Sequence, residues 1–450
     1  MSMIDKISSY LPVIKGAEYS LTFQERIKHT FIVLFMYFLL TSIPIWGVAV
    51  EISERLRELM WVFGSSFGSL ATLGIGPIVM AGILLQLLIG GKIININLQT
   101  EEGRAMFNNY LRFFILVFIL IETSAILLTG SIIPDYNIGL PAMLLYLIIF
   151  VQIALGGFII VLLDDYSTKY AITSGVNLFI LASISLAMFL RIFNPLPSEF
   201  HNAPTGLIFS GIQQLLEGNV NMAIGIFGMV FVTFAMLVLA AYLQAVRVEV
   251  PLIFMRVGGR IFKFPIRVLY TSVIPIILLF AIIVQIESIY RLLTKSNEIP
   301  TILTGPNIIY NLSVYGWSYL TDLFNLFHIL LYLFIYVVGA AVLSYFWVIA
   351  SGMDAKTLAQ QLSNSPVFSL SVRDPRILEK ALEKYIRPIS ILSGVLVGFL
   401  AAISDILGSA IAGTSLLLLV VIAYNIYEDM VRNNVLHLLP LVGKYLAKEK

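Results

Sequence analysis

One apolar run, residues 59–92, constrains the fold of this chain more than any other stretch. The run, LMWVFGSSFGSLATLGIGPIVMAGILLQLLIGGK, is about thirty residues long, whereas a single membrane-spanning helix needs only about 20 residues. Its middle contains residues that weaken or break helices, namely Gly64, Gly68, Gly74, Gly76 and Pro77. The pattern predicts a half-helix over about 56–68, a turn, and a complete helix over about 75–91.

A break in a helix at membrane depth has a restricted set of explanations. Irregular backbone is tolerated there only where protein buries it or where it lines a water-filled cavity. The segment is therefore a candidate wall of an internal pathway. The alternative is a buried helix that is merely kinked, because Gly and Pro are common in membrane helices. The pattern alone favours neither interpretation.

The composition predicts an integral membrane protein, because 59% of the residues are hydrophobic, 12% are charged and the mean hydropathy is +0.94. Cysteine is absent, which excludes disulfides, thiolate metal sites and a cysteine nucleophile. The histidines are scattered without the spacing of metal ligands, so we expect no metal site and no cofactor. The first thirty residues are mixed polar and amphipathic and resemble an interfacial helix at a membrane surface rather than a cleavable signal peptide.

Hydropathy over a window of about 19 residues predicts ten membrane-spanning helices. They are expected near 29–48, 75–91, 111–130, 139–162, 171–193, 221–246, 268–289, 325–350, 388–406 and 410–430. An external loop, 194–220, separates an N-terminal half (29–193) from a C-terminal half (221–430), and 1–28 and 431–450 are cytosolic. Five spans per half make the halves antiparallel, and such inverted repeats place a pathway at their interface. The predicted fold class is an all-α integral membrane protein of two inverted five-helix halves with a re-entrant half-helix.

Lysine and arginine placement sets the orientation, since these residues are enriched on the cytosolic side. With the N-terminus inside, roughly 23 basic residues fall on the cytosolic side and 5 fall outside. Both termini are therefore predicted to be cytosolic. The same asymmetry supports the number of spans, because one missed helix would distribute the basic residues over both the cytosolic and the external loops.

Two cytosolic loops, 247–267 and 352–387, are larger and more basic than simple turns require. In the first loop Gly258 and Gly259 lie between Arg256 and Arg260, which predicts a hairpin or tight turn with arginines at its tip. Exposed arginine suits the recognition of phosphate or carboxylate groups. A large cytosolic partner is one interpretation, and the general inside-positive bias of membrane proteins is the other.

Ionisable groups within the predicted spans are few. Glu122 lies near the middle of the third span, and Gln86, Gln152 and Asn177 are polar residues in other spans. A lone intramembrane carboxylate is a functional candidate, although a buried structural hydrogen bond is the alternative. No paired acid or serine–histidine arrangement indicates a hydrolase, so no enzymatic activity is predicted. A secondary transporter would need ligands at the midplane, whereas an apolar constriction seals a gated conduit by dewetting.

Four stretches resemble the SecY family, the protein-conducting channel of the Sec translocon, in its archaeal form. They are TLGIGPIVMAGILLQLL (72–88), RVEVPL (247–252), KFPIRVLYTSVIPIIL (263–278) and LEKYIRPISILSGVLVGFLAAISDILGSAIAGTSLLL (382–418). The resemblance extends over about residues 23–445. It implies a pore-forming subunit that moves unfolded polypeptides across the membrane and releases hydrophobic segments into lipid through a lateral gate.

The resemblance also implies roles for individual residues. The half-helix 56–68 corresponds to a plug, with Leu59, Met60, Val62, Phe63, Gly64 and Phe67 as its members. The apolar pore ring falls on Ile75, Val79, Val176, Ile180, Ile277 and Leu418. The lateral gate includes Gln86, Val273 and Ile274, and Val273 replaces an asparagine found in many relatives. Ribosome or partner binding falls on Arg247, Arg256, Arg260, Arg373 and Arg376.

The partners implied by the family are a SecE-type subunit, a small single-span beta subunit, the ribosome, signal sequences with nascent or unfolded polypeptides, and membrane lipid. The expected location is the archaeal cell membrane. The energy for transport would come from a partner, because the chain carries no predicted catalytic site.

Overall fold

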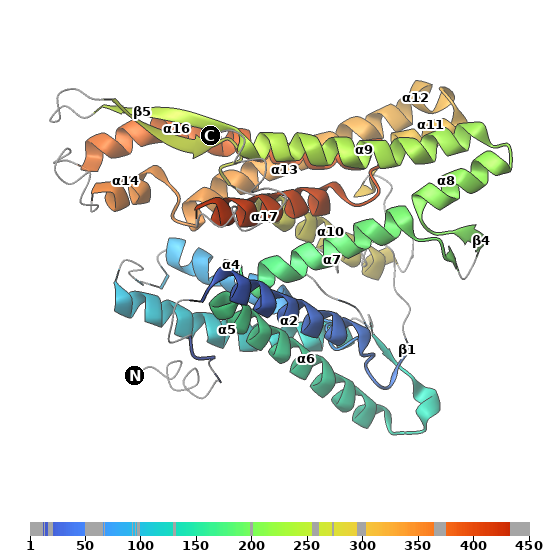
Figure 1. The fold of residues 1–450 in the computed structure, drawn as a ribbon, viewed down its shortest axis with the longest axis horizontal. Helices are drawn as coiled ribbons and strands as arrows, with labels where there is room; N and C mark the ends of the chain where they lie inside the picture. Colours follow the sequence, from blue (N-terminus) through green and yellow to red (C-terminus); the bar gives the residue numbers. More distant parts are fainter. Residues whose placement is uncertain are drawn as a thin grey trace. The chain divides into compact units, whose positions relative to one another are not determined.

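The computed structural model describes residues 12, 14–16, 21–49, 66, 68–91, 93–94, 96, 100–128, 132–198, 201–253, 261–271, 274–294, 303–363 and 375–432. Ten apolar helices dominate this part of the chain, and each overlaps one predicted span (Figure 1). Their bounds are Phe23–Ser42 (α2), Gly76–Gly90 (α4), Glu101–Leu128 (α5), Ala142–Tyr170 (α6), Gly175–Phe193 (α7), Val220–Ala245 (α9), Ile274–Thr294 (α10), Leu323–Ala350 (α13), Pro375–Leu407 (α16) and Gly413–Arg432 (α17). The predicted ten-helix organisation is confirmed.

Seven of the described helices are long and apolar enough to cross a membrane: α5, α6, α7, α9, α13, α16 and α17. The candidate span that contains α13 runs from Leu323 to Gln360. The helix α4 and the stretch Ile274–Ile283 of α10 are apolar but shorter. The helix α2 has 20 residues and carries Glu25 and Arg26 in its first turn.

Shorter elements connect these helices. The two-residue strands Val48–Ala49 (β1) and Ile133–Pro134 (β2) pair, and so do Pro197–Ser198 (β3) and His201–Pro204 (β4). The strands Arg247–Ile253 (β5) and Ile261–Arg267 (β6) form a longer antiparallel hairpin. The short helices are Tyr136–Ile138 (η1, a 3₁₀ helix), Leu207–Leu216 (α8), Ile308–Tyr315 (α11), Ser318–Thr321 (α12) and Ala355–Ser363 (α14).

The helices α2, α5 and α16 begin well before the predicted spans, because each starts with a polar or amphipathic stretch. Thr22 caps α2: its hydroxyl accepts from the Glu25 N–H at 3.4 Å, and its own N–H donates to Glu25 Oε2 at 2.8 Å. The helix α16 was predicted to begin near 388, but it begins at Pro375. Its first three turns are amphipathic, with buried Leu378 and Leu382 one turn apart. Hydropathy averages over such a helix and misses it.

The chain divides into two compact units. Unit 1 comprises Met1–Leu186 and Ile422–Lys450, and unit 2 comprises Ala187–Val421. In unit 1 the helix α5 packs against α4 and α6, and α2 packs against α6. Isoleucines from several of these segments meet in one core: Ile45, Ile115, Ile119, Ile132, Ile149 and Ile153. Unit 1 thus brings the region around the predicted helix break into one packed body.

Unit 2 is built around the pair α13 and α16, which pack along each other. Two glycines allow this close approach. A Cβ atom at Gly394 would lie 2.6 Å from the Ala340 carbonyl oxygen, and one at Gly398 would lie 2.5 Å from the Tyr336 carbonyl oxygen. Replacing either glycine would therefore push the two helices apart.

Buried hydroxyl groups tie the residues before α10 to this pair. The Oγ1 atom of Thr271 lies 2.9 Å from Ser393 Oγ on α16 and 2.9 Å from Ser344 Oγ on α13. Ser344 Oγ also donates to the Ser390 carbonyl oxygen at 2.6 Å. All of these hydroxyl-bearing side chains are at most 1% exposed. Because buried polar groups without partners are costly, this network fixes how α10 enters unit 2.

Candidate functional site

The helix break predicted within residues 59–92 is confirmed for the part that the structure describes. Residues 68–75 form turns rather than a helix, and α4 begins directly afterwards at Gly76. Gly68 and Gly74 have φ angles of 79° and 54°, in the left-handed region that favours glycine. We call residues 68–75 the anchor segment. The plug residues Leu59, Met60, Val62, Phe63, Gly64 and Phe67 lie outside the described residues.

The predicted pore-ring residues all lie in the described part of the chain and all near helix starts. Ile75 is the N-cap of α4 and Val79 follows one turn later, while Val176 and Ile180 lie in the first two turns of α7. These four belong to unit 1, whereas Ile277 of α10 and Leu418 of α17 belong to unit 2. Ile75, Ile180 and Leu418 are buried, and the other three are half-buried.

The predicted gate residues are described only in part. Gln86 lies on α4 in unit 1 and Ile274 is the first residue of α10 in unit 2, whereas Val273 lies outside the described residues. The side chain of Gln86 is half-buried, and its Oε1 atom is buried without a hydrogen-bond partner among the described residues. An unpaired buried polar atom destabilises the arrangement that buries it.

We therefore predict that Gln86→Leu raises the thermal stability of the protein, because an unsatisfied buried polar group costs about 1–3 kcal/mol. Thermal unfolding in detergent measures this effect. Gln152→Leu is the matched control with the opposite expected sign, since Gln152 accepts from the Trp46 N–H at 3.0 Å and donates to the Trp46 carbonyl at 3.2 Å. Equal losses of stability in both variants would show that Gln86 Oε1 is paired in the protein.

The lone intramembrane carboxylate, Glu122 on α5, lies against the beginning of α4. A Cβ atom at Gly76 would lie 2.7 Å from Glu122 Oε2, so the missing side chain at Gly76 makes room for the carboxyl group. Another of the polar span residues, Asn177, donates from Nδ2 to Thr173 Oγ1 at 3.1 Å, close to the start of α7. Asn177 is thus bound within its own turn, and Glu122 is placed at the contact between α4 and α5.

The first basic loop folds as predicted. The strands β5 and β6 pair from Arg247 opposite Arg267 to Ile253 opposite Ile261, so the chain reverses between them. Arg247 is exposed at the start of β5. Arg256 and Arg260 fall between the strands and lie outside the described residues.

The second basic loop contains more helix than expected. The helix α14 occupies part of it, and Arg376 lies in the first turn of α16, where it is exposed. Arg373 lies outside the described residues. A side chain on a helix points in a more fixed direction than one on a loop. Arg376 would therefore present its charge to a partner more rigidly than it would from the loop that the sequence predicted.

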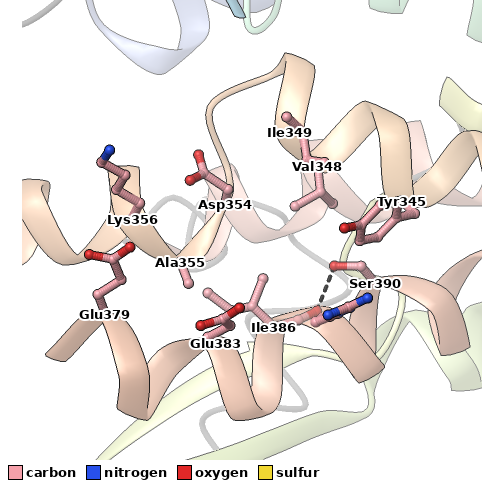
Figure 2. Close-up of a pocket in the computed structure, with 11 residues that line it drawn as sticks. Tyr345, Val348, Ile349, Asp354, Ala355, Lys356, Glu379, Glu383, Ile386 and Ser390 are labelled. Atoms are coloured by element: carbon pink, nitrogen blue, oxygen red, sulfur yellow. Dashed lines mark hydrogen bonds between the residues drawn. The ribbon is translucent and has the colours of Figure 1, made fainter. Parts of the chain in front are cut away.

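A pocket that the sequence did not predict lies between the end of α13, α14 and the first turns of α16. Its volume is about 160 Å³. Figure 2 shows Glu379 and Glu383 of α16 on one side, and Asp354 and Lys356 of the α14 region on the other. The hydroxyl of Thr357 donates to Asp354 Oδ1 at 2.6 Å. Charged groups of both signs therefore surround the pocket.

Within the described residues, no group of three or more His, Cys, Asp or Glu side chains is placed to hold a metal ion. The sequence does not predict this pocket, because its walls come from three separate segments of the chain. The amphipathic start of α16, with Leu378, Leu382 and Ile386 on one face, is the signal that could have located it.

Comparison with known proteins decides the family. The SecY profile matches residues 69–427, from the anchor segment into α17. The chain belongs to the SecY family. The protein translocase subunit SecY of Archaeoglobus fulgidus is 31% identical over 478 residues, covering 98% of this chain and 97% of the relative. The subunit of the same name from Methanocaldococcus jannaschii is 32% identical, and both chains are covered completely.

Solved structures agree with this SecY assignment. One described as the structure of a protein conducting channel superposes with a TM-score of 0.71 at 27% identity. Another concerns the plug domain of SecY, which stabilises the closed state of that channel and maintains a membrane seal, with a TM-score of 0.70 at 27% identity. Sec61 in a canine ribosome-channel complex from the endoplasmic reticulum gives 0.69 at 28% identity. Each comparison covers 97% of this chain and 98% of the other.

Membership in the SecY family explains the apolar helices. They are the spans of a multi-pass integral membrane protein of the archaeal cell membrane. The anchor segment before α4 is irregular backbone next to these spans, and such backbone is tolerated at membrane depth only where protein buries it or where it lines a water-filled cavity.

Proposed function

We propose that this chain is the central pore-forming subunit of a Sec protein translocase. It moves unfolded polypeptides across the membrane and releases hydrophobic segments sideways into the lipid through a lateral gate. The observation that carries the proposal is the helix break at residues 68–75 in a chain of the SecY family, because irregular backbone among spans lines a pathway or is buried by protein. Both termini are cytosolic in this proposal.

The proposed constriction is the ring of Ile75, Val79, Val176, Ile180, Ile277 and Leu418. Their aliphatic side chains close around an extended polypeptide and offer it no hydrogen bond, so the chain can slide. In the absence of a polypeptide, a narrow apolar constriction excludes ions by dewetting. Side chains from both halves, 29–193 and 221–430, contribute, which suits a pathway between inverted repeats joined by the loop 194–220.

The proposed plug, residues 56–68, closes the ring from outside. In a solved SecY channel the plug domain stabilises the closed state and maintains a membrane seal, which supports this role. The proposed gate comprises Gln86, Val273 and Ile274. It opens when the free energy that a segment of about 20 apolar residues gains by partitioning into lipid exceeds the free energy of the contacts that hold the gate closed. The pore itself is not an enzyme in this proposal, and a partner supplies the energy.

The proposed partners follow from the relatives. Sec61 and yeast Ssh1 have been solved bound to ribosomes, and we propose that this chain also binds the ribosome. Arg247, Arg256, Arg260, Arg373 and Arg376 are the proposed contacts with ribosomal RNA. A SecE-type subunit and a small single-span beta subunit complete the complex, and signal sequences, nascent chains and membrane lipid contact it during transport.

Reconstitution tests the function directly. Vesicles containing the chain and its two small subunits are given ribosomes translating a secretory protein, and protease protection reports the translocated fraction. Protection that requires an apolar signal sequence is expected. Equal protection in vesicles lacking this chain would contradict the proposal.

The ribosome contact gives a separate prediction. Arg256→Glu combined with Arg260→Glu is expected to weaken ribosome binding by about tenfold or more, because two attractive charges on a polyanionic surface become repulsive. Co-sedimentation with ribosomes at several salt concentrations measures the affinity. Arg191→Gln is the matched control, since Arg191 lies on the external side of the proposed topology. Unchanged affinity in the double variant would remove these arginines from the contact.

A further inference from the structure

The helices α7 and α17 carry three of the six proposed ring residues close to their beginnings. Val176 and Ile180 lie in the first two turns of α7, and Leu418 lies in the second turn of α17. Each helix begins at a glycine, Gly175 or Gly413. The position at which each helix is held therefore decides where its ring side chains lie.

An aspartate of the preceding span holds the beginning of α7. The Val176 N–H donates to Asp164 Oδ1 of α6 at 3.0 Å. The first N–H groups of a helix have no carbonyl partner within that helix, and the helix dipole makes this end favourable for a negative charge. The Asp164 carboxylate thus binds the main chain of a ring residue directly, within unit 1.

The same arrangement occurs at the beginning of α17. The Gly413 N–H donates to Asp405 Oδ1 of α16 at 2.7 Å, and the Tyr332 hydroxyl of α13 donates to Asp405 Oδ2 at 2.8 Å. Donors from two helices, one on each oxygen, fix the orientation of this carboxylate. Asp405 thus joins the start of α17 to α13 within unit 2.

Both initial glycines lie against the helix that supplies the aspartate. A Cβ atom at Gly175 would lie 2.6 Å from Asp164 Cα, and one at Gly413 would lie 2.2 Å from the Ala401 carbonyl oxygen on α16. A side chain at either position would push the two helices apart. Glycine therefore brings the start of each helix within reach of the carboxylate.

The two contacts occupy equivalent places in the two halves of the chain. The helices α6 and α7 are the fourth and fifth spans of the N-terminal half, and α16 and α17 are the fourth and fifth spans of the C-terminal half. In inverted repeats, equivalent positions face opposite sides of the membrane. The recurrence of one contact in both halves favours a shared role over an incidental packing contact.

We propose that Asp164 and Asp405 are positioning residues for the pore ring. Asp164 fixes the start of α7 and with it Val176 and Ile180. Asp405 does the same for Leu418 on α17. Loss of either carboxylate frees the start of a ring helix to shift, which loosens the apolar constriction and admits water and ions. This inference rests on the proposed function, because it assigns the supports of the proposed ring.

Substitution by leucine and by asparagine separates positioning from general stability. Asp164→Leu removes the acceptor for the Val176 N–H, whereas Asp164→Asn keeps an acceptor oxygen at the same place. In planar bilayers, we expect resting ion conductance to rise by about tenfold or more for Asp164→Leu and to stay within about twofold of the parent for Asp164→Asn. Asp405→Leu and Asp405→Asn are expected to give the same pair of results.

Asp165→Leu is the matched control at the next residue of α6. Asp165 accepts from the Ile14 N–H at 3.0 Å and from Lys169 Nζ at 2.9 Å, and neither donor belongs to a ring helix. We expect this variant to keep the resting conductance of the parent, even if thermal unfolding shows a loss of stability. A folded Asp164→Leu channel that conducts no more than the parent would overturn the positioning role, whatever its melting temperature.

Hydrogen exchange in the unmodified channel decides the matter if the leucine variants do not fold. The Val176 and Gly413 N–H groups are expected to exchange at least about tenfold more slowly than in the unfolded chain, because each donates to a carboxylate. Exchange of these groups at the rate of the unfolded chain would overturn the proposal.

The two proposals fail in different ways. A parent channel that does not translocate a secretory chain contradicts the proposed function. A parent channel that translocates it, while the folded leucine variants stay closed to ions, overturns the role of the two aspartates and leaves the function standing.

Discussion

Deletion of residues 57–65 is expected to produce a channel that still assembles but conducts ions at rest. The deleted residues belong to the proposed plug, while the ten apolar helices and the anchor segment lie outside the deletion. The ring alone then opposes ion flow, and we expect resting conductance in planar bilayers to increase by about tenfold or more. The reason is that a short dewetted constriction is a weaker barrier than one blocked by protein.

Removal of residues 442–450 is the control for this deletion, because it takes the same number of residues from the cytosolic tail. It should leave resting conductance unchanged. A plug deletion that assembles and conducts no more than the parent would contradict the plug assignment without affecting the ring.

Polar substitution of the ring is the second prediction with a large expected effect. Val79→Asn combined with Val176→Asn places two amide groups at half-buried positions of α4 and α7. Burying an amide without partners costs about 2–7 kcal/mol, so water is drawn into the constriction. We expect ion conductance at rest to rise by about tenfold or more. A tenfold rise requires the free-energy barrier to ion flow to fall by only about 1.4 kcal/mol.

The matched control for the ring keeps the same positions apolar. Val79→Leu with Val176→Leu should conserve dewetting, and its conductance should equal that of the parent. If the asparagine variant folds and also stays closed, the two valines do not line the constriction.

Local patterns predicted much of the fold. The ten helices follow from runs of apolar residues, and the helix break follows from the glycines that precede α4. The β5–β6 hairpin follows from the Gly258–Gly259 pair between two extended stretches. Each of these features depends on residues that are close together in the sequence, so local patterns are sufficient to predict it.

Features that depend on contacts between distant residues could not be predicted in this way. Gly156 is one glycine among many in a membrane helix until the structure places Leu70 against it. The room that Gly76 provides for Glu122 likewise joins two different helices. The early start of α16 was missed because its apolar residues alternate with charged ones, which lowers the average hydropathy. The residue roles taken from the family remain predictions that the experiments above address.

A photo-crosslinking amino acid at Val79 or at Ile277 provides the most direct test of a polypeptide pathway through this chain. The two positions lie on α4 of unit 1 and α10 of unit 2, so they report on both sides of the proposed ring. A ribosome-stalled secretory chain should crosslink at both positions, and the crosslinks should disappear when its signal sequence is made polar. Absence of crosslinks at both positions in a folded, ribosome-bound channel would contradict the pathway and favour a transporter of small solutes.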